Sequence, residues 1–488
     1  MNKKYIIAAA FLILGAVNQS CSNDFIDVSP TEAIPESALG EVYNSDEGAR
    51  SLVTAIYAKF LDWNMSTFAW IGVTSIVSDD ADKGSSPGDS GSDKNILDAL
   101  TFTPSTPSFK ELFASNYQGI NRCNQALKYL PQLDKADSDL RKRLTGEAKF
   151  LRAFMYFTLV KSFGGVPLVD HVPVTGVEAD KVMTLTRKSK EEIYAFIEKD
   201  LKDAIETLPN KTTYSGSDVG RASIGAAHAL LAKVYLYQKK WQLAIDECNL
   251  VTGYSLTPNF QDIYKVSGEN NAESVFEING SGDTAGRAIQ QYSQVQGARG
   301  TTGWGWGFAT PTQSLYDAYS AGDTRRDATI IHSSMTLYDG YFVGPNVENK
   351  FYNYKAYSSN YRDQASTDVN IRYLRYAEVL LIKAEAMNEL GQTAGAVPFL
   401  NQVRNRANIG ATPAVSQADV RADIWKQRRL EFAFEHDRWF DLVRTGQAAA
   451  AMAADGGKVF KVGTHEVFPL PQDFIMEAGG LSAQNPGY

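Results

Sequence analysis

The sequence predicts a mainly α-helical protein in which helical hairpins pack against an irregular, loop-rich half with a few short strands. Helices are indicated by several runs with apolar residues at helical spacing, some of which end at Gly or Pro. Loops are indicated by residues 78–93 and about 252–370, which are rich in Gly, Ser, Asp and aromatic residues. The chain has 488 residues, of which 44% are hydrophobic, so it can form a substantial core.

The first twenty residues have the layout of an export signal. Lys3 and Lys4 precede a twelve-residue apolar run, YIIAAAFLILGA, which is shorter than the roughly 20 residues that a membrane-spanning helix needs. We therefore expect residues 1–20 to be cleaved. Cys21 follows the small residue Ser20, as at the lipidation site of a bacterial lipoprotein, so we expect an acyl anchor there. The alternative is a secreted protein with a free first cysteine.

Three helical segments follow in the first half. The run AKFLRAFMYFTLVKSFGG, from Ala148, is predicted to be a helix that stops at Gly164 and Gly165. EEIYAFIEKDLKDAIETLP is predicted to be an amphipathic helix closed by Pro209. The run from Ala222 to about residue 251 reads as two helices joined by a short turn near Lys239.

That last pair of helices has a counterpart later in the chain. LLAKVYLYQKKWQLAIDECNLV, residues 230–251, aligns with LLIKAEAMNELGQTAGAVPFLNQV, residues 380–403, if the later turn is two residues longer. The pattern resembles the tetratricopeptide hairpin, in a degenerate and irregularly spaced form. Short strands are predicted at ESVFEI, from Glu273, and around residues 370–374.

The loop at residues 78–93, SDDADKGSSPGDSGSD, concentrates aspartates, Asp79 and Asp80 among them. An EF-hand loop is excluded because Gly91 stands where a bidentate Glu is required. A serine-hydrolase G-x-S-x-G turn is excluded because Pro87 has no amide hydrogen to donate to an oxyanion. Both a ligand-binding role, with carboxylates accepting hydrogen bonds from hydroxyls, and a solvated acidic loop are consistent with this stretch.

The histidines and glycines indicate neither a metal site nor a nucleotide or redox cofactor, because zinc, P-loop and dinucleotide motifs are all missing from the sequence. His228 lies in an apolar helical run, where a packed side chain is expected. His436 lies in EFAFEHDRWFDLVR, which is predicted to be a helix on which Glu435, Arg438 and Asp441 form structural ion pairs with one another at i,i+3 spacing.

The net charge bears on which ligands the protein can bind, and the cysteine content bears on whether it contains a disulfide. The formal net charge is −8 and no Lys/Arg-rich run occurs, which argues against a nucleic-acid-binding surface. With Cys21 assigned to the anchor, Cys123 and Cys248 remain, both in helical runs. They are expected to be buried free thiols, with a disulfide between them as the alternative.

The stretch GTTGWGWGFATP contains two indoles, Trp304 and Trp306, separated by a single glycine. In an extended chain they would share one face, with Gly303, Gly305 and Gly307 keeping the flanks clear. That face could be an aromatic platform for a ligand or part of the core, and the motif alone does not decide between them.

Five pieces of the chain together resemble the SusD/RagB family of Bacteroidetes outer-membrane lipoproteins. They are GEAKFLRAFMYFTLVKSFGGVPLV (146–169), RYAEVLLIKAEAMNELG (375–391), LNQVRNRAN (400–408), RRLEFAFEHDRWFDLVR (428–444) and QNPGY (484–488). The resemblance implies one SusD-like domain over residues 21–488. Its helical half would span about residues 40–255, and its second half, with ligand loops and further hairpins, about residues 270–488.

The resemblance also implies a function. Such a protein is lipid-anchored at the cell surface on the outer membrane, lies over a SusC-like TonB-dependent transporter and passes a captured glycan to it. It binds without catalysis and without a cofactor. A secreted glycoside hydrolase on a helical scaffold is the alternative, since it needs only two suitably separated carboxylates. A pure assembly or adhesion protein is the third class.

Family members hold glycans on aromatic rings, so the resemblance makes Trp304 and Trp306 the leading ligand residues. Asp79 and Asp80 match an SDD segment that lies near the ligand in related members.

Asn370 and Arg372 are secondary ligand candidates. They lie on one face of the extended piece TDVNIRYLRYAE, just before a predicted scaffold helix. An ion pair with a neighbouring carboxylate is the alternative role for Arg372.

Overall fold

Helices dominate the computed structural model, which describes residues 43–89, 91–282, 287–360 and 366–488. The mainly helical fold predicted from the sequence is confirmed. Residues 1–20 and Cys21 lie outside the described residues, so the signal peptide and the acyl anchor stay predictions. Within the described ranges, no helix combines the length and apolar character needed to cross a membrane.

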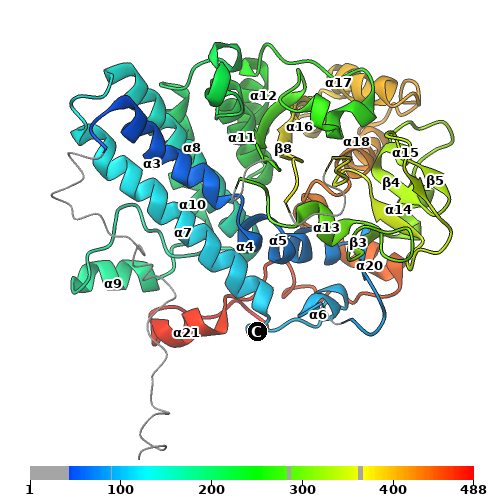
Figure 1. The fold of residues 1–488 in the computed structure, drawn as a ribbon, viewed down its shortest axis with the longest axis horizontal. Helices are drawn as coiled ribbons and strands as arrows, with labels where there is room; N and C mark the ends of the chain where they lie inside the picture. Colours follow the sequence, from blue (N-terminus) through cyan, green and yellow to red (C-terminus); the bar gives the residue numbers. More distant parts are fainter. Residues whose placement is uncertain (1–42, 90, 283–286, 361–365) are drawn as a thin grey trace, which may run out of the picture.

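The longer helices form a continuous layer (Figure 1). In chain order they are α3 (Asp46–Lys59), α7 (Pro107–Tyr129), α8 (Ser138–Phe163), α10 (Lys190–Ile205), α11 (Ile224–Tyr237), α12 (Trp241–Leu250), α16 (Tyr376–Glu389), α17 (Thr393–Arg406) and α18 (Gln417–Phe432). α7 packs on α8, α8 on α10, α10 on α11, α11 on α12, α12 on α16, and α16 on α17 and α18. Packing of each helix on the next in this way is how stacked hairpins bury a shared core.

Local sequence explains where the predicted helices begin and end. α8 stops where expected, because Gly164 takes a positive φ of 72° that other residues rarely adopt. α10 begins with a capping box, in which the Ser189 hydroxyl accepts from the Glu192 amide and the Glu192 carboxylate accepts from the Ser189 amide. α10 ends at Ile205, shortly before Pro209.

The two predicted hairpins are present as α11 with α12 and α16 with α17, and α12 packs against α16. The expected difference between their turns is wrong. Residues 238–240 join the first pair and residues 390–392 join the second, so both turns have the same length. The two additional residues lie in the first helix of the later hairpin, because Leu380 is farther from the end of α16 than Leu230 is from the end of α11.

Short elements and loops make up much of the rest. The short helices are α4 (Trp63–Ser66), α5 (Phe68–Ile71), α6 (Lys94–Asp98), α9 (Glu178–Leu185), α13 (Tyr292–Gln296), α14 (Gln313–Ala318), α15 (Arg326–Thr329), α19 (Arg438–Arg444), α20 (Ala448–Asp455) and α21 (Gln472–Ala478). The strands are β1 (Ala81–Gly84), β2 (Ser274–Ile278), β3 (Phe308–Pro311), β4 (Ile330–His332), β5 (Met335–Thr336), β6 (Phe342–Val343), β7 (Phe351–Asn353) and β8 (Ile371–Arg375).

The strands form antiparallel pairs: β1 with β3, β2 with β8, β4 with β7 and β5 with β6. The strands predicted near Glu273 and residues 370–374 are therefore confirmed as β2 and β8, and they pair with each other. The acidic stretch at residues 78–93 is not loop throughout. Its residues 81–84 form β1, which pairs with β3, the strand that follows the GWGWG segment.

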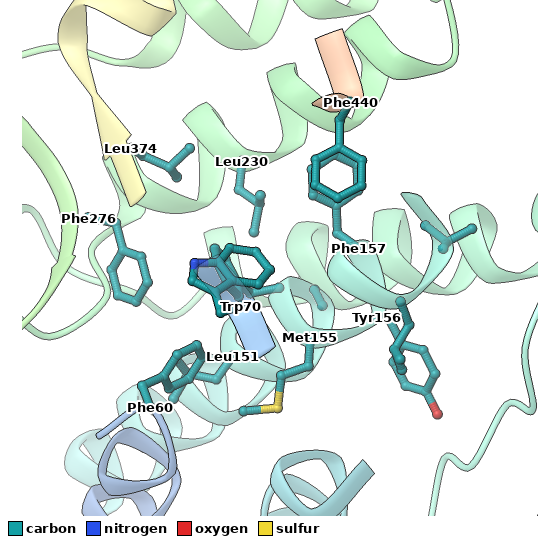
Figure 2. Close-up of a cluster of buried hydrophobic side chains, with 14 of the residues drawn as sticks. Phe60, Trp70, Leu151, Met155, Tyr156, Phe157, Leu230, Phe276, Leu374 and Phe440 are labelled. Carbon is teal, nitrogen blue, oxygen red and sulfur yellow. The ribbon is translucent and has the colours of Figure 1, made fainter. Parts of the chain in front are cut away.

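A single large apolar core joins the helical layer to the loop-rich half (Figure 2). Trp70 of α5 lies in this cluster with Leu151 of α8 and Leu230 of α11, and all three are at most 3% exposed. Phe276 of β2 and Leu374 of β8 contribute from the loop-rich half and are equally buried. Burying each such side chain contributes on the order of 1.5–3 kcal/mol, which couples the two halves energetically.

The segment around His436 is not one helix, contrary to the prediction. α18 ends at Phe432, and α19 begins only at Arg438. Between them, Phe434 and His436 take positive φ angles of 63° and 72°, which are incompatible with a continuous right-handed helix. The turn directs the residues of this segment toward different partners in the core.

Cys123 and Cys248 are buried and free, as predicted. His228 is also packed as expected: it is 7% exposed, and its Nδ1 lies 2.7 Å from a Glu247 carboxylate oxygen.

Candidate functional site

The GWGWG segment is not an extended strand, and its two indoles do not share a face. The amides of Trp304 and Gly305 both donate to the Ala298 carbonyl at 2.8 Å, and the Trp306 amide donates to the Gln294 carbonyl at 2.9 Å. These bonds fold the segment onto residues 294–298. As a result, Trp304 packs into one cluster of side chains and Trp306 against another.

Trp304 is a core residue. Its side chain is 7% exposed, and the rings of Tyr341 and Tyr357 pack edge-on against it at centroid distances of 5.7 and 5.1 Å. Ile331 and Tyr352 belong to the same buried cluster. This burial corrects the expectation that the Trp304 indole is presented to a ligand, because neither ring face is free for a sugar.

The glycines around the indoles permit close backbone packing; they do not clear a platform. A Cβ at Gly303 would lie 2.3 Å from the Ala298 carbonyl oxygen, and one at Gly305 would lie 2.4 Å from that of Gln294. Neither distance is sterically possible, so only glycine allows the segment to approach residues 294–298 this closely. The alternating glycines are therefore a packing requirement.

Trp306 belongs to a half-buried group of rings that we call the surface aromatic cluster: Trp63, Phe68 and Trp306. The centroids of Trp63 and Trp306 are 6.0 Å apart with their planes inclined by 59°, and those of Trp63 and Phe68 are 5.3 Å apart. The buried Phe308 supports Phe68 edge-on at 5.0 Å. Together the rings offer apolar faces at the surface, inclined to one another.

Neighbouring elements hold these rings in place (Figure 1 shows α4, α5, α13 and β3 close together). Trp63 begins α4, and its amide donates to the Gln290 side-chain oxygen at 3.0 Å. The Thr67 hydroxyl donates to the Gln290 carbonyl at 2.6 Å. Trp306 is bound to the carbonyl of Gln294, in α13. The segment at residues 290–296 thus positions both tryptophans.

Two depressions adjoin the surface aromatic cluster. The first, of about 390 Å³, is lined by Phe68, Asp89, Gly91, Ser92, Arg299, Trp306 and Phe308. The second, of about 590 Å³, is lined by Lys59, Asp62, Trp63, Asn64, Pro107, Lys110, Glu111, Ala114, Ser115, Gln118 and Gln290. Both volumes fall in the range of roughly 300–1,000 Å³ that is typical of ligand sites. Aromatic faces and polar side chains therefore border the same surface.

A larger depression lies elsewhere, at the connection between α17 and α18. Its volume is about 700 Å³, and Arg404, Asp423, Lys426 and Val415 are among the residues that line it. All of its lining side chains are aliphatic or polar, so it offers no ring on which a sugar could stack. By volume alone this depression would be the first candidate for a glycan site, whereas the chemistry of the lining residues favours the surface aromatic cluster.

Asp79 and Asp80 are buried in ion pairs, 4% and 2% exposed. Arg438 donates to both carboxylate oxygens of Asp79, at 2.8 and 2.7 Å, and Arg429 donates to Asp80 at 2.6 Å. Burial acts to raise the pKa of Asp79, but the Arg438 and Arg429 guanidinium groups outweigh it and the pKa is lowered. The expectation that these carboxylates meet a ligand is thereby corrected: their oxygens are directed to arginines.

Asn370 and Arg372 are also buried, 2% and 5% exposed. The Asn370 amide nitrogen donates to Glu277 at 3.0 Å and to Asn279 at 2.9 Å, so the side chain ties β8 to β2. Arg372 lies 3.5 Å from the Glu277 carboxylate, which agrees with the alternative role of an ion pair. Both positions are corrected from ligand candidates to structural residues.

The charged segment around His436 is structural as well. Its Nδ1 lies 2.8 Å from the Thr74 hydroxyl and its Nε2 lies 3.0 Å from the Tyr292 hydroxyl. Burial lowers the pKa of His436 to about 3, so the imidazole is neutral at physiological pH. The i,i+3 ion pairs expected between Glu435, Arg438 and Asp441 are not formed: Glu435 pairs instead with Arg375 at 2.7 Å, and Arg438 with Asp79 at 2.7 Å. Across the described parts of the chain, no group of acidic, His and Cys side chains is arranged to hold a metal ion.

Sequence reasoning missed Trp63 and Phe68. Both stand in the run WNMSTFAW, which also contains Trp70. The aromatic density of that run was a usable signal, but it does not distinguish the half-exposed Trp63 from Trp70, which is 3% exposed. Asp89 was predicted only as one of the aspartates of the acidic loop, and Arg299 gave no signal, because the two residues meet across more than 200 positions of sequence.

Comparisons with known proteins agree along the length of the chain. Residues 24–236 match a family model described as starch-binding and associating with the outer membrane, and residues 272–488 match the model of the SusD family. The SusD-like protein P2 of Formosa agariphila is 28% identical over 529 aligned positions that cover all of both chains.

Solved structures with a similar fold include proteins named as SusD-like or as glycan-binding. A laminarin-binding SusD-like protein is 29% identical with a TM-score of 0.76, over 91% of this chain and 99% of the other. Surface glycan-binding protein A of Bacteroides fluxus is 26% identical with a TM-score of 0.75, again over 91% and 99%. Because family models match both halves of the chain and these relatives match it over nearly its whole length, the chain belongs to the SusD/RagB family.

Proposed function

We propose that this protein captures a glycan at the cell surface on the surface aromatic cluster and delivers it to a SusC-like TonB-dependent transporter in the outer membrane. The observation that carries the proposal is the pair of half-buried indoles, Trp63 and Trp306, at the two depressions. The names of the relatives support it, since a laminarin-binding protein and a glycan-binding protein share this fold at 29% and 26% identity.

The chemistry of the site suits a sugar chain. A pyranose ring presents C–H groups on its faces, which complement the electron-rich faces of Trp63 and Trp306. Phe68 supports them from below, since the Lys94 ammonium already lies 4.1 Å from its ring centroid. The sugar hydroxyls on the rim need donors and acceptors, and Asn64, Gln290, Ser92 and Asp89 border the rings. With apolar faces and polar groups interleaved, the surface would retain a polysaccharide.

Truncation of the rings tests the proposal. Trp63→Ala and Trp306→Ala should each lower the affinity for the bound polysaccharide at least about tenfold, because each removes a stacking surface. The measurement is retardation in native gels that contain neutral or acidic polysaccharides. Trp425→Ala is the matched control, since Trp425 is another half-buried indole, packed against the core of α16–α18. It should retain full binding.

Two results would contradict the proposal. If Trp63→Ala and Trp306→Ala bind as the wild type does, the surface aromatic cluster is not the site. Release of reducing sugar by the purified wild-type protein would instead support a glycoside hydrolase over a binding protein.

A further inference from the structure

We infer that the surface aromatic cluster takes uncharged glycans and rejects glycans that carry carboxylate or sulfate groups. The inference rests on the proposed function and specifies its ligand class. It follows from the ion pairs of the two depressions, in which each lining cation is already bound to a carboxylate of the protein. Among the described residues that line the two depressions, an anionic sugar would find no uncommitted cation.

Arg299 is the basic residue of the first depression, which it lines together with Trp306. Its guanidinium lies 3.0 Å from Asp89 and 3.3 Å from Glu348, and it donates to the Ser85 hydroxyl at 2.8 Å. The Asp89 side chain is 36% exposed and the Arg299 side chain 32%, so the pair borders solvent where a ligand would approach. The single Arg299 charge is thus shared between two carboxylates.

Lys59 and Lys110 are the cations of the second depression, next to Trp63. The Lys59 ammonium lies 2.7 Å from Asp62 and donates to the Gln118 oxygen at 2.6 Å. The Lys110 ammonium lies 2.5 Å from Asp473. Glu111 lines the same depression and adds a further carboxyl group. This side of the cluster, too, has at least as many acidic as basic groups.

A uronate or sulfate at these rings would have to displace a carboxylate from Arg299 or Lys59, or bind beside unneutralised carboxylates. At a few ångströms, like charges near a protein surface repel by a few kcal/mol at low salt, which is enough to reject a ligand held by stacking alone. The net charge of −8 adds a weak long-range repulsion. Hydroxyl groups incur no such penalty, because the carboxylates of Asp89 and Asp62 can accept hydrogen bonds from them.

The first experiment compares matched ligands. Wild-type protein is screened against neutral and acidic polysaccharides. The tightest neutral ligand is then titrated calorimetrically beside its own carboxymethylated derivative, which has the same backbone. We expect the derivative to bind at least about tenfold more weakly at low ionic strength, with a smaller difference in 1 M NaCl, where screening shortens the range of the repulsion.

The outcomes separate the inference from the proposed function. Preference for acidic polysaccharides, or equal affinity for the matched pair, would overturn the inference while leaving glycan capture intact. Failure to bind any polysaccharide would overturn both.

The second experiment tests the stated cause. Asp89→Asn combined with Glu348→Gln keeps the shape of both side chains but frees the Arg299 charge, so affinity for the carboxymethylated ligand should rise about tenfold and become salt-dependent. Glu389→Gln is the control: Glu389 pairs with Arg421 at 2.5 Å, on α16 and α18, and this variant should bind as the wild type does. An unchanged affinity in the double variant would show that ion pairing does not set the selectivity.

Discussion

Trp304 and Trp306 have different roles although only Gly305 separates them. The turn in the backbone places Trp304 against Tyr341 and Tyr357, whereas Trp306 packs against Trp63 beside a depression. One indole therefore contributes to stability, and the other is available for binding.

Substitution of each indole in turn separates these roles. Trp304→Ala should lower the free energy of unfolding by about 3–5 kcal/mol, because it leaves a cavity in a packed cluster. Trp306→Ala, at a half-exposed position, should cost clearly less. Guanidinium unfolding followed by tryptophan fluorescence and circular dichroism provides the measurement. Equal losses for the two variants would place both side chains in the core.

At the scale of single residues, the sequence pointed to one segment of the candidate site and missed the others. The aromatic composition of GWGWG pointed to Trp306, which remains a candidate. It also pointed to Trp304, because an extended backbone was assumed where hydrogen bonds to Ala298 and Gln294 produce a turn. Such bonds join segments by tertiary contact, which side-chain spacing does not encode.

Among the secondary-structure elements, buried charge joins β8 to α17 and α18. Arg375 of β8 contacts Glu435 at 2.7 Å and Glu431 at 2.9 Å, and Arg406 of α17 contacts Glu273 at 2.9 Å. These charges are desolvated, so each depends on its partners, and loss of one partner from such a network commonly costs about 3–5 kcal/mol.

Acid should weaken this network. Burial acts to raise the pKa of Glu435, but Arg375 and Lys355 outweigh it and hold the pKa near 2 in place of 4.5. The lowered pKa contributes stability that is fully present above about pH 4.5 and is lost as the pH falls toward 2. The contribution is on the order of 3 kcal/mol.

Urea unfolding between pH 7 and pH 2 measures that contribution. Glu435→Gln should be less stable at pH 7, and its stability should fall less steeply below pH 4.5 than that of the wild type. Glu389→Gln, which alters a half-exposed ion pair, should follow the wild-type profile. Parallel profiles for Glu435→Gln and the wild type would contradict the role assigned to Glu435.

The helices were the most predictable elements, because their signals are local. Glycine at position 164 and apolar periodicity predicted the presence of α8, α11 and α16, although α8 begins at Ser138, ten residues before the predicted start at Ala148. The break between α18 and α19 was not predictable in this way. Helix-forming residues continue through FAFEHD, and the positive φ angles at Phe434 and His436 are imposed by tertiary partners such as Thr74 and Tyr292.

On the scale of the whole molecule, one large apolar core joins the helical and the loop-rich halves of this SusD/RagB-family protein. The proposed anchor would hold the protein at the membrane. Cys21→Ala removes the only proposed attachment, so the variant should move from the membrane fraction to the soluble fraction, provided that the transporter partner is absent from the cells. Immunoblots of fractionated cells, with radiolabelled palmitate to detect acylation, provide the measurement. Persistent membrane retention of the unacylated variant would exclude lipid as its cause.

The close backbone packing of the GWGWG segment bears on how this surface can evolve. Gly303 and Gly305 allow the loop to pack closely on residues 294–298, where hydrogen bonds hold it. Trp306 is therefore preorganised, and binding of a glycan costs the protein little conformational entropy. The same rigidity prevents the loop from adapting its shape to a new sugar linkage. Divergence toward other glycans would therefore proceed by replacing this loop and its glycines together, since point substitution of either glycine would disrupt the loop before it altered the specificity.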